Sequence, residues 1–180
     1  MMVGCAATAR AEMLLNSRTE EIKNRYAGRY LRRGRELLKA DHEETDSFKI
    51  KPEEPLEDTK GKQQQLWKNE FGELSAECGI KGVFGGLWRL AEMAGCGLCI
   101  DQQKIPVLQF AIELCELADE SVYEADSTGV KLFLTRNADE AAERMGRLGI
   151  HAYEIGYTTD TKDRIVKNGD IIRYLTPDER

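Results

Sequence analysis

A cluster of glycines around a lysine is the feature of this 180-residue sequence with the clearest chemical potential. Four glycines flank Lys81 where an apolar helix is expected to begin: Gly79, Gly82, Gly85 and Gly86. The first amides of a helix point outward and favour anions, and a lysine adds a point charge for phosphate. The spacing matches neither a P-loop nor a dinucleotide fingerprint. The segment is a candidate phosphate site, or a place where glycines let a helix pack closely on a sheet while Lys81 stays solvated.

Two of the five cysteines form a CxxC motif, at Cys96 and Cys99. A zinc site needs two further ligands, and the sequence has no second CxxC and only two histidines, His42 and His151. A redox pair would need a helix N-terminus beside one thiol, whereas this pair follows a predicted helix and enters a predicted strand. We therefore interpret the pair as packing residues and predict no metal site. The remaining thiols, expected to be inert, are Cys5, Cys78 and Cys115.

Five carboxylates of the second half have a spacing that does not pair a general acid with a base: Glu77, Glu92, Asp101, Glu113 and Glu116. Only Glu113 and Glu116 could share a helix face, and a solvated surface is the simpler explanation of that pair. With two histidines, no Ser/His/Asp or Cys/His set can be assembled. We predict no catalytic residue, and we do not expect the chain to catalyse a reaction alone.

Composition limits the partners of this chain. The net charge is −6, which argues against nucleic acid. No run approaches the 18 apolar residues of a membrane helix, so no membrane span is expected. An odd number of cysteines without a secretory signal indicates a reduced, cytoplasmic protein.

The charge is unevenly distributed and divides the chain. Residues 18–39 carry eight basic and three acidic side chains, whereas residues 41–70 carry nine acidic and five basic ones. We predict an N-terminal helical segment over residues 1–40, an acidic flexible linker over residues 41–65 and a folded domain over residues 66–180. The linker has few apolar side chains, so it buries too little surface to offset the entropy of ordering.

The N-terminal segment has apolar residues at helical spacing between Met13 and Leu38, which predicts a long helix that packs on the rest of the protein. Its opposite face carries a set of arginines: Arg25, Arg29, Arg32, Arg33 and Arg35. That face could dock on phosphate or on an acidic partner. It could equally be a solvated helix face, or one neutralised by the acidic linker.

From residue 66 onward, helices and strands alternate. A short helical turn is expected around Leu66, Trp67 and Phe71. Helices are predicted over residues 82–94, 107–117 and 137–148, with Asn137 as an N-cap and Gly95 and Gly149 as stops. Strands are predicted over residues 97–100, 130–135, 153–158, 164–167 and 171–174, the last two joined as a hairpin at Asn168-Gly169. This order predicts an α+β or α/β fold with a layered mixed sheet and packed helices, and not a doubly wound sheet.

The run GVFGGLWRLAEMAGCGLCIDQQKIPV, residues 82–107, combines a glycine-rich helix start, A-E-x-x-G-x-G, an acidic residue closing a strand, and K-I-P before the next helix. Ser127-Thr128-Gly129 then precedes an apolar strand. These features resemble the C-terminal domain of the AIR synthase (PurM-like) family. The tail IGYTTDTKDRIVKNGDIIRYLTP and the start MMVGCAATARAEMLL are similar to the hydrogenase-maturation-factor-like branch. The resemblance implies a PurM C-terminal-domain-like fold plus an N-terminal helix.

The resemblance also implies where a nucleotide would be contacted. Family members have a preceding N-terminal catalytic domain that supplies acidic metal ligands, and this sequence starts about where that domain would end. At the family's Asp-x-Thr-x-Gly-Gly loop stands Glu77-Cys78-Gly79-Ile80-Lys81-Gly82, and the terminal cysteine of the dehydratase branch is replaced by Pro-Asp-Glu-Arg. A weak phosphate or nucleotide site is therefore expected at Glu77, Gly79, Lys81, Gly82 and Gly85. We expect no cofactor, since ATP and Mg²⁺ would need a partner domain.

Three functions remain open on this basis. The chain could be a non-catalytic binding or interaction module, a component of a split enzyme that binds ATP or a phosphorylated ligand together with a separate N-terminal half, or a decayed fragment without a present role. The face that an N-terminal domain would cover is expected near the glycine loop, with Phe84, Trp88 and Trp67. Such a face should be covered, so we expect a homodimer or a separate N-terminal-domain partner. The alternative is a monomer in which the chain's own basic N-terminal helix folds back over the face.

Overall fold

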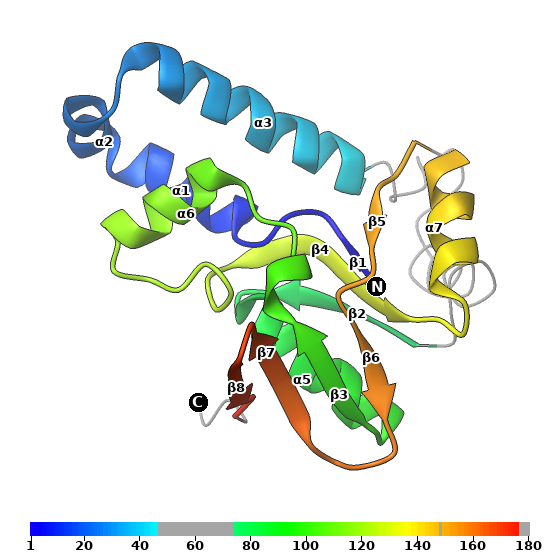
Figure 1. Ribbon diagram of the computed structural model, residues 1–180. Coiled ribbons are helices and arrows are strands. Elements are labelled where there is room, and N and C mark those ends of the chain that lie inside the picture. The colour runs from blue at the N-terminus through cyan, green and yellow to red at the C-terminus, as the bar shows by residue number, and fades with distance from the viewer. Residues whose placement is uncertain (47–73, 148, 177–180) are drawn as a thin grey trace, which may run out of the picture.

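The computed structural model describes residues 1–46, 74–147 and 149–176 (Figure 1). Its helices are α1 (Thr8–Ser17), α2 (Thr19–Arg25), α3 (Gly28–Asp46), α5 (Gly82–Ala94), α6 (Gln109–Leu117) and α7 (Ala138–Arg147), with the short 3-10 helix η1 (Gln102–Lys104). Its strands are β1 (Met2–Val3), β2 (Leu74–Gly79), β3 (Gly97–Asp101), β4 (Ser127–Leu134), β5 (Ala152–Tyr153), β6 (Gly156–Thr159), β7 (Arg164–Asn168) and β8 (Ile171–Tyr174). The strands form two four-stranded sheets with helices packed on them, which confirms the predicted α+β class.

The first sheet has the strand order β2-β4-β1-β5, and each neighbouring pair is antiparallel. On one face, Met2 and Leu132 are fully buried in a core that includes Leu87 of α5. On the other face, Phe133 is buried in a cluster with Met145 of α7. Because successive strand residues point to opposite faces, this sheet buries apolar side chains on both sides.

The second sheet has the order β6-β3-β7-β8 and is mixed, since β3 and β7 run parallel while the two outer pairs are antiparallel. Its inner face contributes Leu98, Ile100 and Val166 to the core around α5, so this helix packs against both sheets. Figure 1 shows α5 behind the second sheet, and among the described elements no helix lies in front of it.

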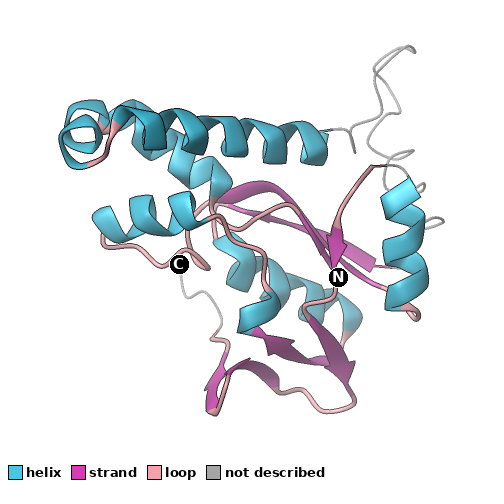
Figure 2. Cartoon of the chain, turned by 45° about the horizontal axis from the view of Figure 1, so that its top comes forward, coloured by secondary structure: helices cyan, strands magenta, loops and turns pink. Residues whose placement is uncertain are grey.

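The N-terminal segment is helical as predicted, but it starts with a strand and is divided into three helices. Arg18 and Tyr26 interrupt it, with φ of −113° and −119°. These breaks let Ile22 and Leu38 pack in one buried cluster with residues of α6. Figure 2 shows α3 running along one side of the molecule, away from the second sheet. The segment thus contributes both a central strand of the first sheet and a helical layer.

Helix α3 continues to Asp46, six residues into the segment 41–65 predicted as a flexible linker. Two contacts explain this extension of the helix. The Cys5 amide donates to Asp41 Oδ1 at 2.9 Å, and Thr45 is buried against the chain near Gly4. The rest of that segment, and the turn predicted around Leu66, Trp67 and Phe71, lie outside the described residues.

Several element predictions are confirmed. Helix α5 spans the predicted residues 82–94, and Gly95 ends it with a φ of 65°. Asn137 caps α7 by accepting the Glu140 amide at 3.2 Å. Strands β7 and β8 pair antiparallel as the predicted hairpin, with Asn168 opposite Ile171.

Other element predictions need correction. The predicted strand over residues 153–158 is two strands, β5 and β6, which belong to different sheets. Between them Ile155 is buried, and its carbonyl accepts the Asp101 amide at 2.8 Å. Helix α6 starts at Gln109, two residues later than predicted, because Leu108 is extended. None of the helices in the described ranges combines the length and apolarity needed to cross a membrane.

Candidate phosphate site at the start of α5

The residues expected to contact phosphate lie along the end of β2, the turn after it and the first turn of α5. The expected loop is partly a strand, because Glu77 and Gly79 belong to β2 and Gly82 already begins α5. Both of these glycines have a φ of 65°, a left-handed conformation that favours glycine. A Cβ on Gly82 would lie 2.5 Å from the carbonyl oxygen of Tyr123. This glycine therefore lets the segment before β4 lie directly against the helix start.

Both carboxylate oxygens of Glu77 have partners on the neighbouring strand β4. Oε1 accepts the Gly129 amide at 3.1 Å, and Oε2 accepts a hydrogen bond from Lys131 Nζ. The Glu77 and Lys131 side chains are 44% and 27% exposed, so the pair lies at the surface of the first sheet. A carboxylate that holds a metal ion directs its oxygens at the ion. This carboxylate instead ties β2 to β4.

The amides at the start of α5 are partly occupied. The Phe84 amide donates to the Tyr123 carbonyl at 3.1 Å, and the Gly85 amide donates to the Lys81 carbonyl at 3.2 Å. A phosphate at a helix start uses the amides that lack an intrahelical partner, and one of these already faces a carbonyl. Lys81 is half-buried and interacts within the protein.

The glycines of this segment allow α5 to approach β2 closely. A Cβ on Gly86 would lie 2.9 Å from Cys78 Cα and 3.0 Å from a methyl group of Leu132. Arg89 of α5 donates to the Cys78 carbonyl at 2.7 Å and to the Glu77 carbonyl. These contacts favour the packing interpretation of the glycines. Phosphate binding at Lys81 stays a prediction.

Two of the large apolar residues near this segment contact other side chains of the chain, whereas Ile80, in the turn before α5, is 72% exposed. The Phe84 ring stacks on Tyr123 with centroids 5.3 Å apart and an angle of 12°. The Arg164 guanidinium lies 3.7 Å from the centroid of the Trp88 ring. The uncovered face that the sequence led us to expect is therefore not formed by Phe84 and Trp88, and Trp67 lies outside the described residues.

The five cysteines are free thiols with mostly buried surroundings. Burial raises the pKa of Cys78 to about 12 and that of Cys115 to about 11. Burial and the adjacent Asp41 carboxylate also raise the pKa of Cys5. Because a reactive thiol needs a lowered pKa, these three are poor nucleophiles. Within the described ranges, no group of three or more His, Cys, Asp or Glu side chains could hold a metal ion.

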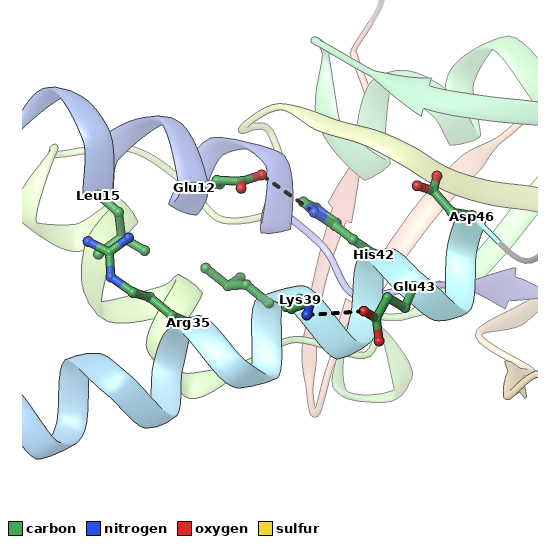
Figure 3. Close-up of a pocket in the computed structure, with 8 residues that line it drawn as sticks. Glu12, Leu15, Arg35, Lys39, His42, Glu43 and Asp46 are labelled. Carbon is green, nitrogen blue, oxygen red and sulfur yellow. Dashed lines mark ion pairs between the residues drawn. The ribbon is translucent and has the colours of Figure 1, made fainter.

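A groove that sequence reasoning missed lies between α1 and α3 (Figure 3). It has a volume of about 210 Å³ and is lined by Glu12, Leu15, Arg35, Leu38, Lys39, His42, Glu43 and Asp46. His42 Nδ1 lies 3.4 Å from Glu12 Oε2, and Lys39 Nζ lies 3.5 Å from Glu43 Oε1. His42 was assigned to a linker, so no sequence signal placed it beside α1.

The arginine face predicted on the N-terminal segment is divided between two helices. Arg25 ends α2, and the other four side chains project from the first half of α3. All of them are exposed: Arg25, Arg29, Arg32, Arg33 and Arg35. Docking of an acidic partner on this face stays a prediction.

The two sheets, the shared helix α5 and the N-terminal strand define a PurM-like fold of the HypE kind. The structure of E. coli HypE is similar over 99% of this chain and 49% of its own length, with a TM-score of 0.63 and 17% identity. A second similar structure is AaThiL complexed with AMPPCP and TMP, which matches 97% of this chain and 49% of its own length with a TM-score of 0.52 and 17% identity. A chain of the HypE-HypF complex matches 66% of this chain and 41% of its own length, with a TM-score of 0.51 and 22% identity.

This chain spans about half the length of these solved structures, or less. No protein-family model matches the sequence. No curated protein matches it either. The likeness to HypE and ThiL therefore establishes the fold, as the sequence resemblance predicted.

Proposed function

We propose that this chain is a non-catalytic interaction module, structurally related to hydrogenase maturation proteins, that acts by binding another polypeptide. The observation that carries the proposal is the position of Glu77. This carboxylate stands where the family resemblance puts a nucleotide-site acid, and it is bound instead to the Gly129 amide and to Lys131. Five free thiols support a reducing, cytoplasmic setting.

Phosphoryl chemistry depends on positioned metal and positive charge around the transferred group. The Glu77 carboxylate accepts a hydrogen bond from the neighbouring strand, and the Phe84 amide donates one to the Tyr123 carbonyl. Both hydrogen bonds favour a structural role for this segment. A binding role is supported by the solved complex of HypE with HypF, one chain of which this protein resembles.

The test is an assay of ATP hydrolysis by the purified chain with Mg²⁺. We expect no turnover above background, and no difference between the unmodified protein and Glu77→Ala. Glu116→Ala, an exposed carboxylate on α6, serves as the matched control. Sustained hydrolysis that Glu77→Ala abolishes and Glu116→Ala preserves would contradict the proposal.

A second candidate is a component of a split enzyme that binds ATP or a phosphorylated ligand together with a separate polypeptide. It is favoured by the likeness to HypE solved in complex with ATP, at a TM-score of 0.52, and to AaThiL with AMPPCP. In this case AMPPCP should bind the chain in calorimetry, and Lys81→Ala should weaken the binding. Absence of saturable binding would leave the interaction module as the better account.

A further inference from the structure

The outer face of the second sheet carries large apolar side chains in contact with solvent. One row across the four strands consists of Tyr157, Cys99, Ile165 and Tyr174, which the strand register places opposite one another. The two tyrosines are 60% and 65% exposed, and Ile172, on the same face of β8, is 58% exposed. Both ends of the row are therefore solvent-exposed tyrosines.

The inner and outer faces of this sheet differ because strand residues alternate. Leu98, Ile100 and Val166 point inward and are at most 3% exposed. Their neighbours along β3 and β7 point outward, where the described part of the chain provides no helix to cover them (Figure 1). The apolar residues of this face are therefore not explained by packing among the described residues.

Exposed tyrosines that share one face with an exposed isoleucine are typical of an interaction site. Tyrosine is enriched among the residues that dominate binding energy. Single exposed apolar residues are ordinary, whereas a contiguous apolar patch of several hundred Å² on a monomer is often functional. Tyr157 lies on the edge strand β6, and Ile172 and Tyr174 lie on the opposite edge strand β8 of the same face.

We propose that this outer face is a self-association surface on which the sheet of a second copy packs, forming a two-fold dimer. The proposal rests on the proposed function, since it names the partner of the interaction module. Two apolar sheets that pack face to face lie about 10 Å apart and interleave their side chains. An identical sheet supplies the same twist and an equally apolar face.

The distribution of charge favours a second copy over a strongly charged partner. The whole chain has a net charge of −6, so two copies repel each other on most approaches. The strands and connections of the second sheet, residues 97–104 and 156–174, carry four acidic and five basic side chains. This near-neutral region adds little repulsion between two copies and offers no large net charge to a strongly charged partner.

The face is also complementary to itself. Cys99, in the middle of the row, is only 7% exposed, and its side chain interacts with Tyr157 of the same chain. At one end of the same face, Asp101 and Lys167 are register neighbours of opposite charge. In an isologous dimer each copy presents the same patch, so Lys167 can face Asp101 of the partner subunit.

The test compares two adjacent isoleucines of β8 by sedimentation equilibrium of the full chain. Ile171 and Ile172 are 55% and 58% exposed, but they point to opposite faces. The unmodified protein should be a dimer at about 100 µM, Ile172→Lys should raise the dissociation constant at least about tenfold, and the control Ile171→Lys should change it by less than about threefold. Tyr157→Ser on β6 gives a second variant, and circular dichroism checks that each variant is folded.

A monomer at that concentration would overturn the proposal. Equal weakening of the dimer by Ile171→Lys and Ile172→Lys would also overturn it, because it would indicate pairing through the edge of β8. Loss of association in Ile172→Lys and Tyr157→Ser, with association kept in Ile171→Lys, would support it. An ATP assay on the same samples separates the two claims. A monomer without turnover defeats only self-association, whereas turnover defeats the interaction module.

Discussion

The first sheet buries apolar side chains on both faces, whereas the second buries them on one. Leu132 and Phe133 are consecutive residues of β4, point to opposite faces and are at most 1% exposed. Ile171 and Ile172 are consecutive residues of β8 and are both more than half exposed. Each pair belongs to the same fold and has a strongly apolar sequence. What differs is how many of the described elements cover the strand.

This difference separates the part of the molecule that should carry its stability from the proposed binding surface. Burial of apolar area from water is the main source of folding stability, so the first sheet and α5 should carry most of it. The outer face of the second sheet contributes little to folding stability while it is exposed to solvent. Its apolar residues gain stabilisation only when something covers them, which is the property of a binding surface.

The largest expected effect is on the reactivity of a thiol buried in the first sheet. Burial raises the pKa of Cys78 in the first sheet to about 12. At pH 8 its alkylation by iodoacetamide should therefore be at least about 100-fold slower in the native protein than in urea. Cys99, on the outer face of the second sheet and 7% exposed, should react faster than Cys78. Peptide mapping by mass spectrometry measures both rates, and a native Cys78 that reacts as fast as Cys99 would contradict the comparison.

Truncation of a side chain should cost far more in the first sheet than on the outer face of the second. Leu132→Ala removes a side chain that is fully buried, and it should lower the free energy of unfolding by about 2–5 kcal/mol. Ile172→Ala, measured with the protein dilute enough to be monomeric, should cost less than about 1 kcal/mol. Urea unfolding followed by circular dichroism gives both values. Equal costs would show that the outer face is packed in the monomer.

Two glycines with the same backbone conformation test how closely α5 is packed. Gly82 and Gly95 both have a φ of 65°, but only at Gly82 would a Cβ meet backbone atoms within 3 Å. Gly95→Ala should cost about 1 kcal/mol for the strained conformation alone. Gly82→Ala should cost at least about 1 kcal/mol more, because the segment from Tyr123 to Ala125 must move. Indistinguishable unfolding free energies would refute close packing at this helix start.

The smallest expected effect belongs to the tie between β2 and β4. Glu77→Gln removes the charge of the Glu77–Lys131 pair while keeping the shape of the side chain. Because both side chains are partly exposed, the loss should be below about 1 kcal/mol and smaller at high salt. Urea unfolding at low and high salt measures it. A loss of several kcal/mol would mean that Glu77 does more than join two strands.

The sequence predicted those parts of the fold that depend on local signals. Helix α5 was located by its apolar periodicity and by Gly95, and the β7–β8 hairpin by Asn168-Gly169. The strand β1 has only two residues and lies centrally because Met2 pairs with Leu132, a partner far along the chain. No local pattern reveals a pairing of that kind. The division of residues 153–158 between two sheets depends on tertiary contacts in the same way.

The candidate site was predictable only in part, for a similar reason. The glycines around Lys81 were visible as a helix start, but the partners of Glu77 are set by the register between β2 and β4. Tyr123, whose carbonyl accepts a hydrogen bond from the Phe84 amide, comes from a segment with no recognisable sequence signal. The exposed face around Tyr157 was missed because exposure depends on which elements cover a strand. The sequence of a strand does not reveal which elements those are.

The most direct test of the account is hydrogen–deuterium exchange of the full chain at a low and a high protein concentration. At the high protein concentration we expect slower amide exchange in the peptides of β3, β6, β7 and β8 than at the low one, because a second copy covers their outer face. Exchange in β1, β2 and β4 should stay the same, since both faces of the first sheet are already covered. Protection that appears around the start of α5, or nowhere, would contradict the claim that the second sheet is the binding surface.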